Sequence, residues 1–131
     1  MNDKKLARFC LAFIFIYQGL VPKILFLDKT ELYINQQHLE LLPAQNLIDD
    51  VLMAQLAGSG EILLGMLLII FHQKNWPIWT SLGFLSFLLL DIIVLAPELL
   101  TGAFNPLSIN IAAMLLAYIA LQPKVSRWKI S

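Results

Sequence analysis

Residues 51–71 read VLMAQLAGSGEILLGMLLIIF, a continuous apolar stretch that contains a single charged residue, Glu61. A stretch of about 20 apolar residues is long enough to cross the hydrocarbon core of a bilayer as an α-helix. A surface helix of a soluble protein would instead show a polar face along its whole length. This stretch therefore predicts a membrane-spanning helix and decides the fold class.

Three further stretches have a similar length and composition. Together they predict four spans, at residues 6–27, 51–71, 77–96 and 104–121. The connection formed by residues 28–50 is long enough either for a short helix over the outer ends of the spans or for an ordinary acidic loop. Linkers and internal repeats are absent from the sequence, so we expect one all-α domain, a transmembrane four-helix bundle in contact with lipid.

The composition agrees with this class. Hydrophobic residues make up 59% of the 131 residues, whereas roughly half is usual in soluble domains. The formal net charge of zero argues against a nucleic-acid partner. The only cysteine, Cys10, excludes an intramolecular disulfide and a cysteine-based metal cluster, and we expect no metal site.

Basic residues flank the predicted spans mainly on one side of the membrane: Lys4, Lys5, Arg8, Lys74, Lys124, Arg127 and Lys129. The connections on the other side are mainly acidic. The positive-inside rule then places both termini in the cytoplasm, where Trp76, Trp79 and Trp128 would form an aromatic belt. The first apolar stretch is too long for a cleavable signal peptide, so we expect it to remain as an anchor.

Five polar side chains fall within the predicted spans, in or near their outer halves: Gln18, Lys23, Glu61, Asp91 and Asn110. A charged side chain in hydrocarbon costs several kcal/mol, so it usually faces other helices and pairs there. We therefore expect these residues to bind a ligand, while the cytoplasmic half offers almost nothing comparable. Each charge also has a structural explanation. Lys23 could reach the outer headgroups, Glu61 could be a member of a buried ion pair, and Asp91 could be a buried hydrogen-bonding residue or a protonated acid.

Small residues accompany Glu61 at helical spacing. Ala54, Ala57, Gly58 and Gly65 recur with it at intervals of three and four residues. Membrane helices approach one another most closely along such strips. We therefore expect this strip to pack against another helix and to turn Glu61 away from lipid.

Pro22 should distort the first span. Its nitrogen cannot donate to the carbonyl of Gln18, and its ring pushes that turn open. Gly19 makes bending easier. The freed carbonyl and the Gln18 side chain would then lie close to Lys23.

Three stretches together resemble the DoxX-like family: YQGLVPKI at residues 17–24, AGSGEILLG at residues 57–65 and FNPLSINI at residues 104–111. The positions that match the family's motifs are Gln18, Gly19, Pro22, Lys23, Gly58, Glu61, Gly65, Asn105, Pro106 and Asn110. Asp91 lies outside them. The resemblance implies a small multi-pass protein of the bacterial inner membrane with four spans.

The family's name also implies a place beside quinone chemistry, because it derives from a subunit associated with a terminal quinol oxidase and thiosulfate:quinone oxidoreduction. The chain lacks flavin, nucleotide and thiol-exchange motifs. His38 and His72 fall in connecting segments, where we expect solvated or structural residues and not haem ligands. We therefore expect no catalytic residues but a non-catalytic subunit or quinone-site component, partnered by a membrane oxidoreductase or by further copies of itself.

Two other functions stay open. The first is a small proton-coupled carrier, in which Glu61 is the coupling site and Lys23 meets an anionic solute. The second is a structural membrane scaffold whose polar residues only fix the register of the helices.

Overall fold

The computed structural model describes residues 2–42 and 47–123, and these are helical with no strand. The all-α prediction is therefore confirmed. The described residues form five α-helices, a π-helical turn η1 and a 3₁₀ turn η2. Their order is α1 (Asp3–Leu20), η1 (Val21–Leu25), α2 (Lys29–Leu41), α3 (Asp50–Ile70), α4 (Trp76–Leu95), η2 (Pro97–Thr101) and α5 (Pro106–Leu121).

Three helices are long and apolar enough to cross a membrane: α1 continued by η1 (Asp3–Leu25), α3 and α4. Their bounds lie within a few residues of the predicted spans. The fourth apolar helix, α5, has 16 residues, which corresponds to about 24 Å at 1.5 Å per residue. It is therefore shorter than a hydrocarbon core of about 30 Å, and the fourth span stays a prediction.

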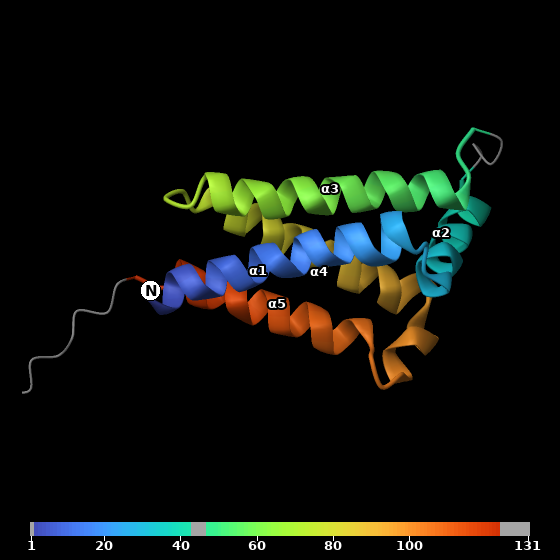
Figure 1. Ribbon diagram of the computed structural model, residues 1–131. Helices are drawn as coiled ribbons and strands as arrows, with labels where there is room; N and C mark the ends of the chain where they lie inside the picture. The colour runs from blue at the N-terminus through green and yellow to red at the C-terminus, as the bar shows by residue number, and fades with distance from the viewer. Residues whose placement is uncertain (1, 43–46, 124–131) are drawn as a thin grey trace, which may run out of the picture.

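The helix α1 packs between α3 and α5, and α4 packs mainly against α5 (Figure 1). The short helix α2 lies across the ends of α3 and α4, at the end of the molecule opposite the N-terminus (Figure 1). The apolar core occupies the half away from α2, with Leu11, Phe15, Leu68, Ile78 and Ala117 among its members. Among the described residues, four buried polar side chains lie in the half that α2 covers (Lys23, Asn35, Glu61 and Asn110), and two lie in the other half (Arg8 and Ser81).

The two helices α1 and α3 touch through their backbones. A Cβ atom built on Gly19 would collide with the carbonyl oxygen of Gly58, and the converse is also true. A Cβ on Gly65 would lie 2.8 Å from the carbonyl oxygen of Ala12. The predicted close approach is confirmed at Gly58 and Gly65, but Ala57 is exposed and does not belong to the contact.

Regular α-helical geometry ends just before Pro22. From Val21 the chain forms the π-helical turn, in which the Phe26 amide donates to the Val21 carbonyl at 3.0 Å. A widened turn is the expected response to a residue with no N–H. Leu27 then adopts a positive φ of 46°, a conformation that few non-glycine residues take, and the chain turns into α2.

Candidate functional site

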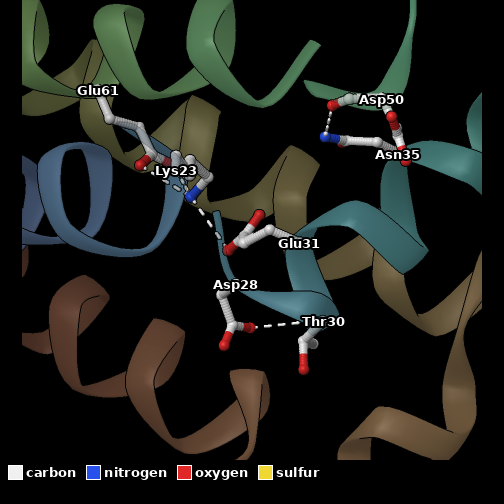
Figure 2. Close-up of polar contacts among 7 residues, drawn as sticks. All are labelled: Lys23, Asp28, Thr30, Glu31, Asn35, Asp50 and Glu61. Atoms are coloured by element: carbon white, nitrogen blue, oxygen red, sulfur yellow. Dashed lines mark hydrogen bonds and ion pairs between the residues drawn. The ribbon is translucent and has the colours of Figure 1, made fainter. Parts of the chain in front are cut away.

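The centre of the candidate site is an ion pair between two spans. The Nζ atom of Lys23, on η1, lies 3.0 Å from Oε1 and 2.9 Å from Oε2 of Glu61, on α3 (Figure 2). Both residues are almost fully buried, with 8% of Lys23 and 3% of Glu61 exposed. Lys23 therefore does not extend to the headgroups, and Glu61 faces other helices as predicted.

Close helix packing brings this pair together. A Cβ on Gly58 would lie 2.9 Å from Cβ of Lys23, and one on Gly19 would lie 3.0 Å from Cβ of Glu61. The two glycines thus occupy the same helix crossing as the two charges. Without side chains at this crossing, the backbones come close enough for Lys23 to reach both carboxylate oxygens.

A third charged residue joins the pair from α2. The Oε1 atom of Glu31 lies 3.3 Å from Nζ of Lys23 (Figure 2). An ammonium group has three hydrogens, and here three carboxylate oxygens surround it. One cation therefore faces two acids, so the cluster carries one negative charge when all three groups are ionised.

Asp91, on α4, pairs with a different residue of α2. Its Oδ1 atom lies 2.8 Å from Nε2 of His38, whose Nδ1 atom lies 2.8 Å from the carbonyl oxygen of Ile34. The His38 and Asp91 side chains are 24% and 15% exposed. The prediction of a solvated or structural residue in a connecting segment is thus wrong for His38 only in that His38 lies on the helix α2, where its role is structural; His72 is exposed after α3, as predicted.

The remaining predicted site residues lie apart from the ion pair. Asn110 is buried, but its Nδ2 atom donates to the Pro106 carbonyl of its own helix at 2.7 Å. Gln18 is half-buried and makes no side-chain hydrogen bond to another described residue. Within the part of the chain that the structure describes, direct contact joins Lys23 and Glu61 alone among the five predicted residues. The binding roles of the other three stay predictions.

Sequence reasoning missed the polar inner side of α2. Besides Glu31 and His38, Asn35 is 7% exposed and donates from Nδ2 to the backbone carbonyl of Asp50 on α3, at 3.0 Å (Figure 2). Gln36 donates to the Oδ2 atom of Asp50 at 2.8 Å. The available signal was the spacing of Glu31, Asn35 and His38 by four and three residues, which places them on one helical face.

A further contact of α2 ties it to η2. The hydroxyl of Tyr33 donates to Oε1 of Glu98 at 2.6 Å. This hydrogen bond lowers the pKa of Glu98 and raises the pKa of Tyr33 above their ordinary values. Both side chains lie outside the spans, at the surface.

The opposite half of the spans also contains a buried charge, which corrects our expectation that it offers almost nothing polar. Arg8 is 6% exposed and donates to the backbone carbonyls of Leu68 at 3.1 Å, Phe71 at 3.0 Å, and Lys74. The carbonyls of Leu68 and Phe71 belong to the end of α3, where helical acceptors lack partners, and that of Lys74 belongs to the turn that follows. Arg8 therefore caps α3 in addition to contributing to the basic flank.

The DoxX-like family matches residues 12–118. The chain belongs to the DoxX-like family. The matched region includes every motif residue on which the resemblance rested, and it confirms that resemblance. The comparisons with curated proteins and with solved structures gave no match. Family membership and the apolar helices together identify a multi-pass membrane protein whose outer surface contacts lipid.

Proposed function

We propose that this DoxX-like protein is a non-catalytic subunit of a membrane redox assembly that binds a quinone headgroup beside Lys23 and Glu61. The observation that carries the proposal is the buried Lys23–Glu61 pair with a second acid, Glu31, at the same ammonium group. Such a cluster offers a hydrogen-bond donor and a proton acceptor side by side. A quinone headgroup requires both.

The proposal includes a topology of four spans in the bacterial inner membrane, with α5 as the fourth and both termini in the cytoplasm. The N-terminus lies at the end opposite α2 (Figure 1). Arg8 binds the Lys74 carbonyl at that end, so the basic residues at the start of α1 and after α3 share one side of the molecule. This distribution supports a cytoplasmic N-terminus. The basic residues Lys124, Arg127 and Lys129, and Trp128, lie outside the described residues.

The chemistry of the cluster suits a quinone. A quinone accepts two electrons and two protons, and the electrons would come from the partner oxidoreductase. Lys23 would donate a hydrogen bond to a carbonyl oxygen of the headgroup. Glu61 would hold Lys23 in place and take up or return a proton at its carboxylate.

The geometry also indicates where a ligand oxygen would bind. Glu61 contacts the ammonium group through two oxygens at 3.0 and 2.9 Å, whereas Glu31 contacts it through one oxygen at 3.3 Å. Glu31 also lies on α2, outside the spans. The position of Glu31 is therefore the one that a ligand carbonyl would take, and Glu31 would compete with the ligand for Lys23.

Mass spectrometry of small molecules that remain bound through gentle detergent purification tests the proposal. We expect the wild type to retain an isoprenoid quinone and Glu61→Gln to lose it. Glu31→Gln should retain at least as much as the wild type, because a competitor for Lys23 is weakened. Glu40→Gln is the matched control, since it removes an exposed carboxylate of the same helix.

Two outcomes would overturn the proposal. One is wild-type protein that contains bulk lipid alone even when it is purified from membranes rich in quinone. The other is equal retention by the wild type and a folded Glu61→Gln variant, because the quinone would then bind elsewhere.

A second candidate function, a small proton-coupled carrier, is favoured by the excess of acids around Lys23. Two carboxylates facing one ammonium leave a negative charge that a proton could neutralise. In this case pH-dependent uptake of an anionic solute into proteoliposomes should disappear in Glu61→Gln. A structural scaffold would show neither ligand retention nor uptake.

A further inference from the structure

The Asp91–His38 contact has no part in the function proposed above. Asp91 belongs to a span and His38 to α2. The two hydrogen bonds that the imidazole ring of His38 makes, one through each nitrogen, are both 2.8 Å long. The two partners of the ring differ in kind. One is a backbone carbonyl and the other is a carboxyl group, and this difference determines where hydrogens must be.

The hydrogens follow from the acceptors. A carbonyl oxygen carries no hydrogen, so Nδ1 of His38 must donate to the carbonyl of Ile34. If Nδ1 carries the hydrogen of a neutral ring, Nε2 has a lone pair and would face the lone pairs of an ionised Asp91. A hydrogen bond at 2.8 Å requires one additional hydrogen between Nε2 and Oδ1.

We propose that His38 and Asp91 form a proton-binding site, in which one exchangeable proton between Nε2 and Oδ1 fastens α2 to α4. The proton belongs to the pair, as an imidazolium with a carboxylate or as a neutral imidazole with a carboxylic acid. In both forms the pair is electrically neutral. A neutral pair is the form that a partly buried position beside a membrane span favours.

The surrounding charges leave His38 as the partner for Asp91. Of the helices that pack against α2, α4 has Asp91 as its one charged residue and α3 has Asp50 and Glu61. Asp50 accepts hydrogen bonds from Asn35 and Gln36, and Glu61 binds Lys23. Neither α3 nor α4 contains a lysine or arginine.

The other ionisable groups near α2 are also engaged or exposed. On α2 itself, Glu31 contacts Lys23 of η1, while Glu40 and Lys29 are exposed. On η2, Glu98 accepts a hydrogen bond from Tyr33. None of these described groups therefore supplies a cation to the His38–Asp91 pair in place of its proton.

Loss of the proton should loosen α2. The deprotonated pair would carry one negative charge, and His38 could keep either the Ile34 bond or the Asp91 bond but not both. This inference goes beyond the proposed function and holds whatever ligand binds Lys23.

Nitrogen-15 NMR of ring-labelled histidine tests the site directly in purified, quinone-free protein. The chain has two histidines, so the exposed His72 serves as an internal reference and His72→Gln assigns the signals. In the wild type we expect the shifts of both ring nitrogens of His38 to be those of hydrogen-bonded nitrogens. Asp91→Leu has a side chain of similar size without a polar atom, so it should remove the hydrogen bond of Nε2.

Hydrogen–deuterium exchange of α2 supplies the structural readout. Amides of α2 should exchange about tenfold faster or more in Asp91→Leu, because a charge-assisted hydrogen bond is lost. Amides of α3 should not change. The proposal is overturned if Nε2 of His38 has the shift of a nitrogen without a hydrogen bond in the folded wild type, or if α2 exchanges at the same rate in wild type and a folded Asp91→Leu variant.

Discussion

A comparison of Gly58→Ala with Gly60→Ala would test whether backbone contact between α1 and α3 holds the molecule together. Both glycines lie on α3, two residues apart. A Cβ on Gly60 would have no neighbour within 4 Å, whereas one on Gly58 would collide with the carbonyl oxygen of Gly19. The two substitutions therefore add the same methyl group to the same helix, once where there is free space and once where another backbone lies in contact.

Two effects of opposite sign act on the free energy of unfolding. Replacement of glycine by alanine inside a helix stabilises it by up to about 1 kcal/mol, and Gly60→Ala should show this gain alone. At Gly58 the methyl group meets backbone, which cannot rotate away as a side chain could, so α1 and α3 must separate. Overpacking of this kind costs about 1–3 kcal/mol. Both variants share the helix gain, so they should differ by the overpacking cost alone, about 1–3 kcal/mol in free energy of unfolding.

Equilibrium unfolding in mixed micelles, with an increasing fraction of denaturing detergent, would measure this difference. Helical circular dichroism reports unfolding, and Gly83→Ala is a second control because its added methyl group also meets nothing within 4 Å. Equal free energies of unfolding for Gly58→Ala and Gly60→Ala would refute the reasoning. They would show that α1 and α3 are not in backbone contact in the folded protein.

Two further predictions use the same unfolding measurement. Arg8→Met should destabilise the protein by about 2–4 kcal/mol, because carbonyls at the end of α3 lose a charged donor. Arg8→Lys should recover part of this loss. An Arg8→Met variant as stable as the wild type would contradict the capping role. Tyr33→Phe should lower the free energy of unfolding at neutral pH. Because the pKa of Glu98 is lowered in the folded protein, this effect should fade as the pH falls below the ordinary pKa of glutamate. Because the pKa of Tyr33 is raised, the effect should also fade as the pH rises above the ordinary pKa of tyrosine. A difference between wild type and Tyr33→Phe that is the same at every pH would contradict that bond.

The helices that resemble spans could be predicted because hydropathy is a local property of the sequence. A window of about 20 residues contains the information that decides whether a segment enters a bilayer. The strip around Glu61 was also predictable, with one error. Ala54, Gly58, Glu61 and Gly65 follow the four–three–four spacing of a single face and are buried, whereas Ala57 precedes Gly58 by about 100° of helical rotation and lies outside the contact.

The role of α2 could not be predicted in the same way. Its polar residues look like the solvated side of a surface helix, because their partners lie far away in the sequence. Asn35 binds α3 and His38 binds Asp91 on α4. Composition shows that the polar face exists, but only the three-dimensional arrangement shows that this face points inward.

Arg8 was misjudged for a related reason. A basic residue before an apolar stretch satisfies the positive-inside rule by position alone. The same residue is long enough to reach the end of α3, where free carbonyls accept its hydrogens. A topological signal and a structural contact thus coincide in one side chain, and the sequence displays only the first.

The buried charges share a pattern that bears on function. Arg8 and Lys23 are each satisfied by α3, through carbonyls in one case and Glu61 in the other. Asp91, in contrast, depends on α2 for its hydrogen-bond partner, His38, and Lys23 depends on α2 for its third carboxylate oxygen, that of Glu31. Displacement of α2 would therefore free one donor position at Lys23 and uncover one acid on α4. In the function proposed above a ligand would replace Glu31 at Lys23, so displacement of α2 would favour ligand binding there.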